Sequence, residues 1–550
     1  MTPGLALTSS RRVAGVAAEE LRRAMAMMKA PGHPRPYFLS YLIRDEEAWT
    51  IQARYGAVGQ DSRRRRRNAF CDVRVGSHRY DQVREGGLDD NDKEAESYSY
   101  VDLPFDGHLD GTRHGLWRLA DARYREALET LLNKRSHALT YRDQNRGFQA
   151  FEKLEARRAE DWKTLPTIDH DFWLDYVTRV SRSLKRYGDI KDSHVEFSAD
   201  LTARVFVDSV GSRIIESHPV VSLECYLWLL SKRGDAFPWT HKITVTDLEE
   251  LPDEKAFRRQ ISKVVTQLRA LAEAPLVRSF SGPAFLEPIP AGLLIHEAVG
   301  HRLEGCRLLA SGEGQTFKGA LGKKVLPSFL SVYDDPPRTH YDGCSLVGHY
   351  RYDDEGVVAA RANLIEDGVL KDYLRTRVGL ARGHRSNGHA RCCYHERPIS
   401  RMGVLCVEAR DGLERKALWQ RFLDEIVRSG APYGLRVVHA SSGETATDAY
   451  NFQAFMGEIN LAARVYPDGR QEWIRGVNFV GTPLNATQGI VAAGRVGEVD
   501  NAWCGAESGY VPVSTVSPAL VLSELELQAK PEQPYTPYTY EMPWVRGARR

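Results

Sequence analysis

The segment that decides the fold of the second half of the chain is Ala291-Gly-Leu-Leu-Ile-His-Glu-Ala-Val-Gly-His-Arg-Leu-Glu-Gly305. It opens with an apolar run, then places His296 beside Glu297 and brings in His301 five residues after the first histidine. Two histidines with a glutamate between them are typical of helices that hold zinc through neutral imidazoles, where the glutamate acts as a base. The alternative is two ordinary histidines, one at a helix cap and one packed in the core.

The spacing of the two histidines sets a condition on the backbone. Residues four apart on an α-helix lie about 40° apart around its axis, whereas residues five apart lie about 140° apart. His296 and His301 can therefore share one ion only if the helix ends, breaks or bulges between them. Gly300, directly before the second histidine, permits such a change of backbone direction.

A change of composition precedes this segment. Prolines occur at positions 275, 283, 288 and 290, with a glycine and serines between them, which is typical of a linker. We therefore expect two domains, an N-terminal α+β domain at residues 1–275 and a C-terminal β-rich domain at residues 276–550. In the second domain, Leu364–Leu374 has Asp-Gly at its centre and predicts a β-hairpin.

The N-terminal half mixes the two apolar periodicities without a βαβ repeat, which indicates an α+β fold. The polar stretch Arg44-Asp-Glu-Glu47 between two β-prone runs predicts a hairpin turn. The predicted helices are 13–29, 113–133, 148–162, 172–187 and 257–274, and the predicted strands are 36–43, 48–55, 71–75, 194–207 and 212–216.

The composition excludes several classes of protein. The 550 residues contain 75 Lys and Arg against 73 Asp and Glu, so the net charge of +2 gives no general field for nucleic acid or an anionic membrane. No run approaches the ~18 apolar residues of a membrane span. Eight cysteines are too few for a disulfide scaffold, and the apolar stretch after Arg11-Arg12 is too short for a leader peptide. We expect a cytoplasmic protein that binds neither nucleic acid nor membrane.

Five consecutive arginines, Arg63 to Arg67, are the one strongly charged run. Such a run can form a nucleic-acid patch. Here it lies between β-prone segments, no aromatic residues interleave it, and the overall charge is balanced. We interpret it as a solvated loop.

Several motifs in the second half resemble the TldD/PmbA metallopeptidases, in their TldD-type, catalytic branch. The resemblance covers roughly residues 280–527, and its motifs occur in the family's order. They are Leu293–Gly305, Tyr352–Gly356, Asn363–Leu374, Ser386–His389, Pro398–Met402 and Cys504–Val513.

This resemblance implies a metal site and a reaction. It makes Cys504 the third ligand beside His296 and His301, holding one Zn²⁺ per subunit in the C-terminal catalytic domain. A fourth position is then left for water, whose proton Glu297 takes as general base. The implied activity is hydrolysis of small or unfolded peptides, bound as an added β-strand.

The resemblance also implies a dimer, either a homodimer or a heterodimer with a PmbA/TldE-type subunit. The alternative function is a catalytically silent partner subunit or scaffold. An intact set of His296, Glu297, His301 and Cys504 argues against it, because a silent subunit has no need of all four. Where the family has a glycine-rich run, residues 440–450 are Ala-Ser-Ser-Gly-Glu-Thr-Ala-Thr-Asp-Ala-Tyr, a departure that bears on the peptide specificity and on the choice of partner.

Other residues near these motifs have a structural and a functional interpretation. Glu304 is either a carboxylate that orients one of the histidines or a solvated charge. Arg401 either binds a peptide carboxylate or forms salt bridges within the fold. We interpret Cys306 and the His389–His395 cluster as structural rather than as metal ligands. Four further cysteines are interpreted as core thiols: Cys71, Cys225, Cys344 and Cys406.

Overall fold

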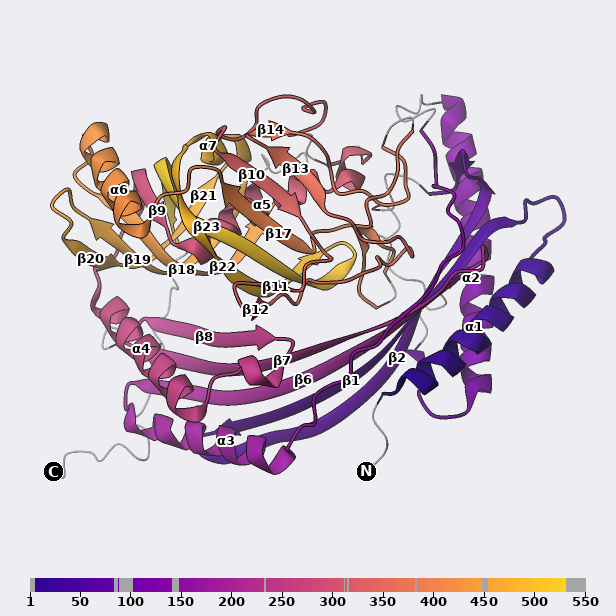
Figure 1. Ribbon diagram of the computed structural model, residues 1–550, viewed down its shortest axis with the longest axis horizontal. Coiled ribbons are helices and arrows are strands. Elements are labelled where there is room, and N and C mark those ends of the chain that lie inside the picture. The colour runs from indigo at the N-terminus through magenta and orange to yellow at the C-terminus, as the bar shows by residue number, and fades with distance from the viewer. Residues whose placement is uncertain are drawn as a thin grey trace.

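The computed structural model describes residues 5–83, 88, 102–140, 148–231, 234–310, 312–313, 316–380, 383–394, 396–447 and 454–530. The chain has a mixed α+β fold of two domains, as predicted. One large sheet takes its strands from the first half of the chain and another from the second half. The C-terminal domain lies against the concave face of the long, curved N-terminal sheet (Figure 1). The predicted division after residue 275 falls in the connection between α4 and β9.

The N-terminal sheet has eight strands, with four long antiparallel strands in the order β2-β1-β6-β7 at its centre. Alternate residues of each strand point to opposite faces. One face packs on α1 and α2 at one end and on α3 and α4 at the other. The helices are α1 (Leu7–Met27), α2 (Leu109–Thr140), α3 (His170–Ser183) and α4 (Glu254–Glu273), and the strands are β1 (Pro36–Arg54), β2 (Ala57–Ser77), β3 (Tyr80–Asp81), β4 (Asp102–Leu103), β5 (Arg158–Asp161), β6 (Ile190–Asp208), β7 (Arg213–Leu230) and β8 (Ala236–Val245).

The hairpin predicted at Arg44–Glu47 is wrong, because β1 runs through this stretch without a turn. The chain reverses later, at Tyr55-Gly56, where both residues have positive φ. The charged residues stay in the strand because neighbouring elements supply partners for them. Arg44 forms an ion pair of 3.0 Å with Asp354 of the C-terminal domain, and Asp45 lies opposite Arg67 of β2.

The arginine run is likewise not a solvated loop, because it lies inside β2 and pairs with β1 along its whole length. The odd-numbered members meet carboxylates on the face that carries the helices. Glu47 accepts from Arg63 Nε at 2.5 Å and from Arg65 Nη2 at 3.1 Å. Arg67 is buried and forms a two-pronged ion pair with Asp45, whose second bond is 2.9 Å long.

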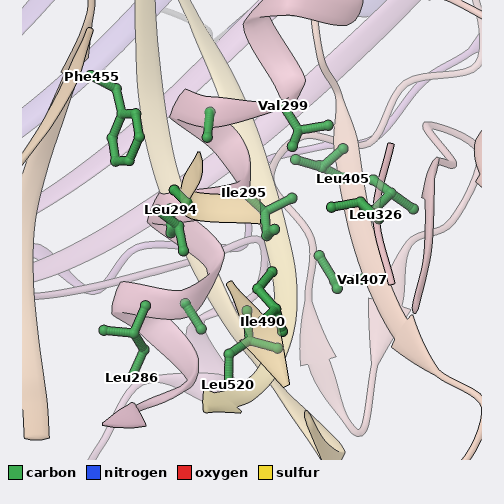
Figure 2. Packing of buried hydrophobic residues seen from close by; sticks show 14 of the residues in the cluster. Leu286, Leu294, Ile295, Val299, Leu326, Leu405, Val407, Phe455, Ile490 and Leu520 are labelled. Atoms are coloured by element: carbon green, nitrogen blue, oxygen red, sulfur yellow. The ribbon is translucent and has the colours of Figure 1, made fainter. Parts of the chain in front are cut away.

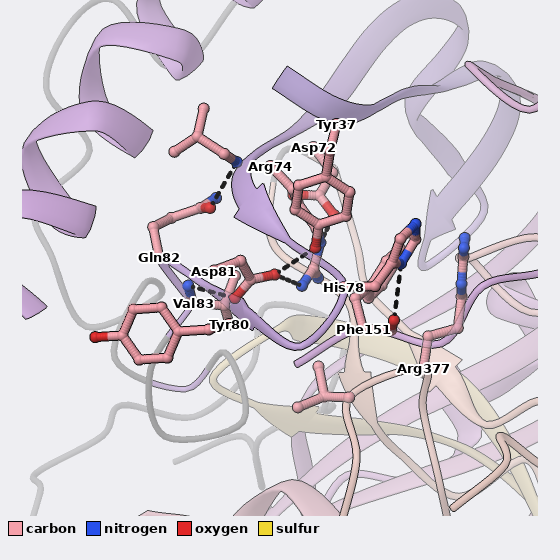
Figure 3. A network of polar contacts seen from close by, with 12 residues as sticks. Tyr37, Asp72, Arg74, His78, Tyr80, Asp81, Gln82, Val83, Phe151 and Arg377 are labelled. Atoms are coloured by element: carbon pink, nitrogen blue, oxygen red, sulfur yellow. Dashed lines mark hydrogen bonds and ion pairs between the residues drawn. The ribbon is translucent and has the colours of Figure 1, made fainter. Parts of the chain in front are cut away.

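The helix predicted at residues 148–162 is also wrong. Residues 148–157 have no regular secondary structure, and 158–161 form β5. The Phe151 ring lies between the guanidinium groups of Arg74 and Arg377, 3.6 and 3.9 Å from its centroid (Figure 3). Its carbonyl oxygen also lies 2.9 Å from His78 Nδ1. These contacts to both domains hold the segment extended and outweigh its helical tendency.

The C-terminal sheet has eleven strands, and two further strand pairs lie outside it. Its strands are β9 (Ser279–Leu286), β10 (Leu330–Asp334), β13 (Ala362–Glu366), β14 (Val369–Leu370), β17 (Val404–Ala409), β18 (Gly434–Thr445), β19 (Phe455–Val465), β20 (Gln471–Ile474), β21 (Val477–Gly481), β22 (Ile490–Ala506) and β23 (Gly509–Ala529). The separate pairs are β11 (His340–Tyr341) with β12 (Cys344–Ser345) and β15 (Ala390–Arg391) with β16 (Ile399–Ser400). The hairpin predicted at Leu364–Leu374 is confirmed as β13 and β14, with Asp367-Gly368 at its turn.

The core of this domain is helix α5 (Pro288–Ala298). Strands β9, β18, β19, β21 and β23 pair in a closed ring, and α5 packs against β18 and β23 of that ring. Leu294 and Ile295 are fully buried beside Leu286 of β9 and Leu520 of β23 (Figure 2). Each such side chain contributes about 1.5–3 kcal/mol by leaving water. Two more helices, α6 (Arg415–Ser429) and α7 (Pro483–Gln488), complete the domain.

Within the described residues, no helix is both long enough and apolar enough to cross a membrane.

The Arg67–Asp45 pair predicts a large effect on stability. Arg67→Ala leaves a buried carboxylate without its cation and should lower the free energy of unfolding by about 3–5 kcal/mol. Arg64→Ala, at an exposed position of the same run, should change it by less than about 0.5 kcal/mol. Urea unfolding followed by circular dichroism measures both, and equal effects of the two substitutions would contradict the assignment.

Candidate metal centre

Helix α5 ends between the two histidines. His296 lies in its last turn, Val299 leaves helical geometry at φ −120° and ψ −54°, and His301 lies in a following 3₁₀ helix, Gly300–Leu303. The two rings meet edge to face, with centroids 5.0 Å apart. The change of direction that the five-residue spacing requires is therefore present.

Gly300 allows another segment of the chain to pack closely against this helix end, because it has no side chain. A Cβ atom at this position would lie 2.2 Å from Met402 Sδ, so no larger residue fits while Met402 keeps its place. Met402 is buried and belongs to the Pro398–Met402 motif of the sequence. The glycine thus lets a separate segment of the chain pack against the helix end.

Cys504 of β22 completes a group of three donors. Its Sγ lies 3.3 Å from His296 Nε2 and 3.3 Å from His301 Nε2, although it is 203 residues from His301 in sequence. One donor atom from each residue lies within 4.8 Å of the other two, and all three side chains are buried. In a tetrahedral zinc site, sulfur and nitrogen ligands are roughly 3.5 Å apart. The structure therefore brings the three predicted ligands together at distances that suit one zinc ion.

The Cys504 thiolate suits a cation, and a bound cation would take the place of the proton that now favours His301. Burial disfavours a thiolate, yet His301, His296 and Arg401 hold the pKa of Cys504 well below its ordinary value. Burial likewise opposes charge on His301, but Cys504 and Glu304 raise its pKa well above the usual range. An anionic sulfur beside two imidazole nitrogens is the donor chemistry that zinc prefers.

Glu304 orients His301. Its Oε1 lies 3.1 Å from His301 Nδ1, which leaves Nε2 directed at Cys504. The carboxylate is fully buried and also accepts from Arg307 Nε at 2.8 Å. Burial alone would raise its pKa, but His301 and Arg307 hold the pKa of Glu304 at about 2. Of its two interpretations, the structure supports the orienting carboxylate, a common partner of metal-binding histidines.

Arg401 belongs to the fold and has no access to a substrate. Its side chain is completely buried and donates to the Cys504 carbonyl oxygen at 2.6 Å, and also to Ser508 Oγ and the Gly509 carbonyl oxygen. These bonds fix the turn between β22 and β23 and thereby the position of the Cys504 backbone. Arg401 is thus a positioning residue for the third donor.

Glu297 lines the same cavity of about 310 Å³ as the three donors. Gly443 of β18 leaves room for its side chain, because a Cβ there would lie 2.5 Å from Glu297 Cγ. Arg302 ties the helix end to β18, donating to the Glu297 carbonyl oxygen at 2.8 Å and to Thr445 Oγ1 at 2.6 Å. The Glu297 backbone is therefore fixed at the helix end, and its side chain lines the cavity beside the three donors.

Two features of this cavity were not predicted from the sequence. Asp500 of β22 lines it, and burial raises the pKa of its carboxyl. Ser441 to Thr445 of β18 form one wall, although this stretch differs from the glycine-rich run of the resembling family. The alternating pattern of β18 gave a signal for a strand, but no residue type in it indicated a metal pocket.

The other cysteines and histidines that were considered as metal ligands have structural roles where the structure describes them. Burial raises the pKa of Cys306 to about 12, so it stays a thiol, and it lies outside the group of donors. His389 is fully buried between Asn387 and Asp334, while His395 lies outside the described residues. Cys71, Cys225 and Cys406 are buried as expected, whereas Cys344 is exposed, because it lies in the short β11–β12 hairpin.

Comparison with known proteins finds a family model and relatives that resemble the second half of the chain. A model of the PmbA/TldA metallopeptidase C-terminal domain matches residues 280–529. A metalloprotease of Archaeoglobus fulgidus is 29% identical over 272 residues, 49% of this chain and 57% of that protein. A zinc metalloprotease TldD homolog of Saccharolobus solfataricus is 23% identical over 340 residues, 62% of this chain and 71% of that protein. The match thus spans little more than half the length of the Archaeoglobus protein.

The whole fold also has a solved counterpart. TldE from Thermococcus kodakarensis superimposes with a TM-score of 0.60 at 13% identity, over 94% of this chain and 100% of that one. This likeness concerns the fold alone and includes the N-terminal domain, where the sequence offered no motif.

Cys504→Ser tests the third donor. Loss of the thiolate should remove the stoichiometric zinc, because a serine hydroxyl stays protonated and binds zinc weakly. Cys306→Ser is the matched control and should keep the metal. Mass spectrometric metal analysis of the two purified variants decides, and one zinc per chain in Cys504→Ser would contradict the assignment.

Glu304→Gln tests the orienting carboxylate. Without the charge, His301 is less firmly oriented and zinc affinity should fall about 10–100-fold. Competition with a zinc-binding dye measures this change. An unchanged affinity in a correctly folded variant would show that Glu304 serves the fold alone.

Proposed function

We propose that this chain, whose residues 280–529 belong to the TldD/PmbA family, is a zinc-dependent metallopeptidase that hydrolyses small or unfolded peptides. The observation that carries the proposal is the convergence of His296, His301 and Cys504 on one buried point beside Glu297. A relative named as a zinc metalloprotease supports the choice of metal.

In this proposal His296, His301 and Cys504 hold the zinc ion. When bound, the ion supplies a Lewis acid that polarises the scissile carbonyl and acidifies water. Glu297 takes a proton from the attacking water at its carboxylate and later gives it to the leaving amine. Gly443 leaves room for that side chain, and Arg302 holds the Glu297 backbone at the helix end.

The substrate binds as an added β-strand. Ser441–Thr445 of β18 pair with β19 on one edge, and β9 reaches β18 only at Leu435–Val437. On the other wall, Ala502–Ala506 of β22 pair with β23. Among the described residues, neither stretch has a strand partner on its second edge, and both line the metal cavity. An extended peptide can use these main-chain groups whatever its side chains.

Oligomerisation is part of the same proposal. The chain acts as a homodimer, or as a heterodimer with a PmbA/TldE-type subunit. This part of the proposal rests on the sequence resemblance of residues 280–529 to the TldD/PmbA family.

Glu297→Gln separates catalysis from metal binding. The amide cannot take a proton, so kcat on an unfolded protein such as casein should fall by about 10²–10⁴-fold. Zinc content should stay at one ion per chain. The matched control is Glu366→Gln, the same change at an exposed position of β13, which should leave kcat unchanged. Zinc binding without any Glu297-dependent cleavage would contradict the proposed activity and favour the silent subunit.

A further inference from the structure

A second, larger cavity adjoins the metal pocket. It has a volume of about 530 Å³ and lies between the concave face of the N-terminal sheet and the β22–β23 hairpin. We call it the interdomain cavity. Trp503 lines both this cavity and the metal pocket and directly precedes the proposed ligand Cys504. A role of the interdomain cavity in substrate binding rests on the proposed function, because it requires that the chain cleaves peptides.

Strand alternation divides the arginine run between two faces of the sheet. Arg63, Arg65 and Arg67 point to the face covered by helices, where Glu47 and Asp45 neutralise them. The even-numbered Arg64 and Arg66 point to the opposite face and line the interdomain cavity. Two arginine side chains of the run, Arg64 and Arg66, therefore line a cavity next to the metal site.

Most charges of this cavity already have partners. Asp354 pairs with Arg44 at 3.0 Å and with Arg204 at 2.8 Å. Arg66 pairs with Asp102 at 3.2 Å and stacks over Tyr394, 4.4 Å from the ring centroid. Arg64, by contrast, has no ion pair or hydrogen bond within the described part of the chain, although it shares the attraction of Glu46 with Arg44 and Arg66, and its side chain is exposed to the cavity.

The rest of the lining favours an anionic ligand. Five arginines and four carboxylates line the cavity. The one carboxylate without an arginine beside it is Asp200, and burial raises its pKa to about 6. Burial, with Lys163 as the next cause, lowers the pKa of His349 to about 4, and burial with Arg204 lowers that of His218. Arg204 and Lys163 also oppose protonation of these two histidines, and the lining keeps an excess of one arginine over its carboxylates.

Aromatic side chains of the C-terminal domain also line the cavity. Trp503 and Tyr510, at the end of the β22–β23 hairpin, are 42% and 70% exposed. Apolar surface of this size beside a binding cavity suits a side chain of a ligand. Lys242 lies 5.5 Å from the centroid of the Trp503 ring, so the ring is held between the two domains.

We propose that the interdomain cavity is a substrate subsite that selects acidic peptides. Arg64 is the specificity-determining residue and pairs with a Glu or Asp side chain of the substrate. Trp503 packs against a neighbouring substrate residue on the path from the metal pocket. The five-arginine run, left without a function by the sequence, then has two roles: stability on the helix face and selectivity on the cavity face.

The test uses internally quenched peptides that differ only in one residue, Glu, Gln or Lys, placed in turn at each position around the cleavage site. With the zinc-loaded full chain, kcat/KM should be about fivefold to tenfold higher for Glu than for Lys at one position, as for a single charge pair that is partly exposed. Arg64→Gln should bring this ratio close to one, and Arg64→Lys should keep most of it. Arg65→Gln, on the helix face, is the matched control and should leave the ratio unchanged.

Binding is measured separately, by fluorescence anisotropy of labelled peptides on the Glu297→Gln variant. The same preference for Glu and the same loss in an Arg64→Gln background are expected. An unchanged Glu-to-Lys ratio in Arg64→Gln overturns the inference and leaves the proposed peptidase activity intact. A preference of the wild-type chain for Lys also overturns it, and would assign the subsite to Asp200. Selective binding without zinc-dependent cleavage contradicts the proposed function and not the subsite. No binding and no cleavage of any peptide contradicts both.

Discussion

The end of helix α5 is the constraint on which the rest of the structure depends. Two histidines five residues apart can reach one point only where the helix stops between them, and α5 stops at Ala298. The apolar side chains of the helix, Leu294 and Ile295 among them, are buried against a closed ring of strands, which sets the position of the helix end. The same ring carries β18 along one side of the helix end, and β22 brings Cys504 to the other. The contacts that pack α5 in the core therefore also set the positions of the proposed metal ligands.

Buried ion pairs and hydrogen bonds also fix the positions of the residues around the proposed metal site. Glu304 lies between His301, Arg307 and Arg401, and Arg401 in turn holds the backbone of Cys504. In an interior of low dielectric, each of these groups needs its partner, so none can rotate away cheaply. The same principle joins the two domains, where Arg44 and Arg204 of the N-terminal sheet share Asp354 of the C-terminal domain. The metal pocket and the interdomain cavity are thus held in a fixed relation.

Local patterns predicted much of this from the sequence, and long-range pairing explains the rest. The apolar period of Ile261, Val264 and Leu268 predicted α4, and the histidine spacing required a helix end, break or bulge if the two residues share one ion, of which the structure has the helix end. The arginine run was misinterpreted because its carboxylate partners lie on another strand, and 148–162 because Phe151 is held by Arg74 and Arg377. Cys504 came from a family resemblance, whereas Asp500, the β18 wall and the role of Arg401 required the three-dimensional structure.

The proposed binding of one zinc ion by His296, His301 and Cys504 can be tested by X-ray absorption spectroscopy at the zinc edge of the purified full chain, because sulfur and nitrogen neighbours differ in distance and scattering strength. We expect one sulfur at about 2.3 Å and two imidazole nitrogens at about 2.0–2.1 Å, with a light atom in the remaining position. A zinc ion with no sulfur neighbour, or with two or more, would contradict it.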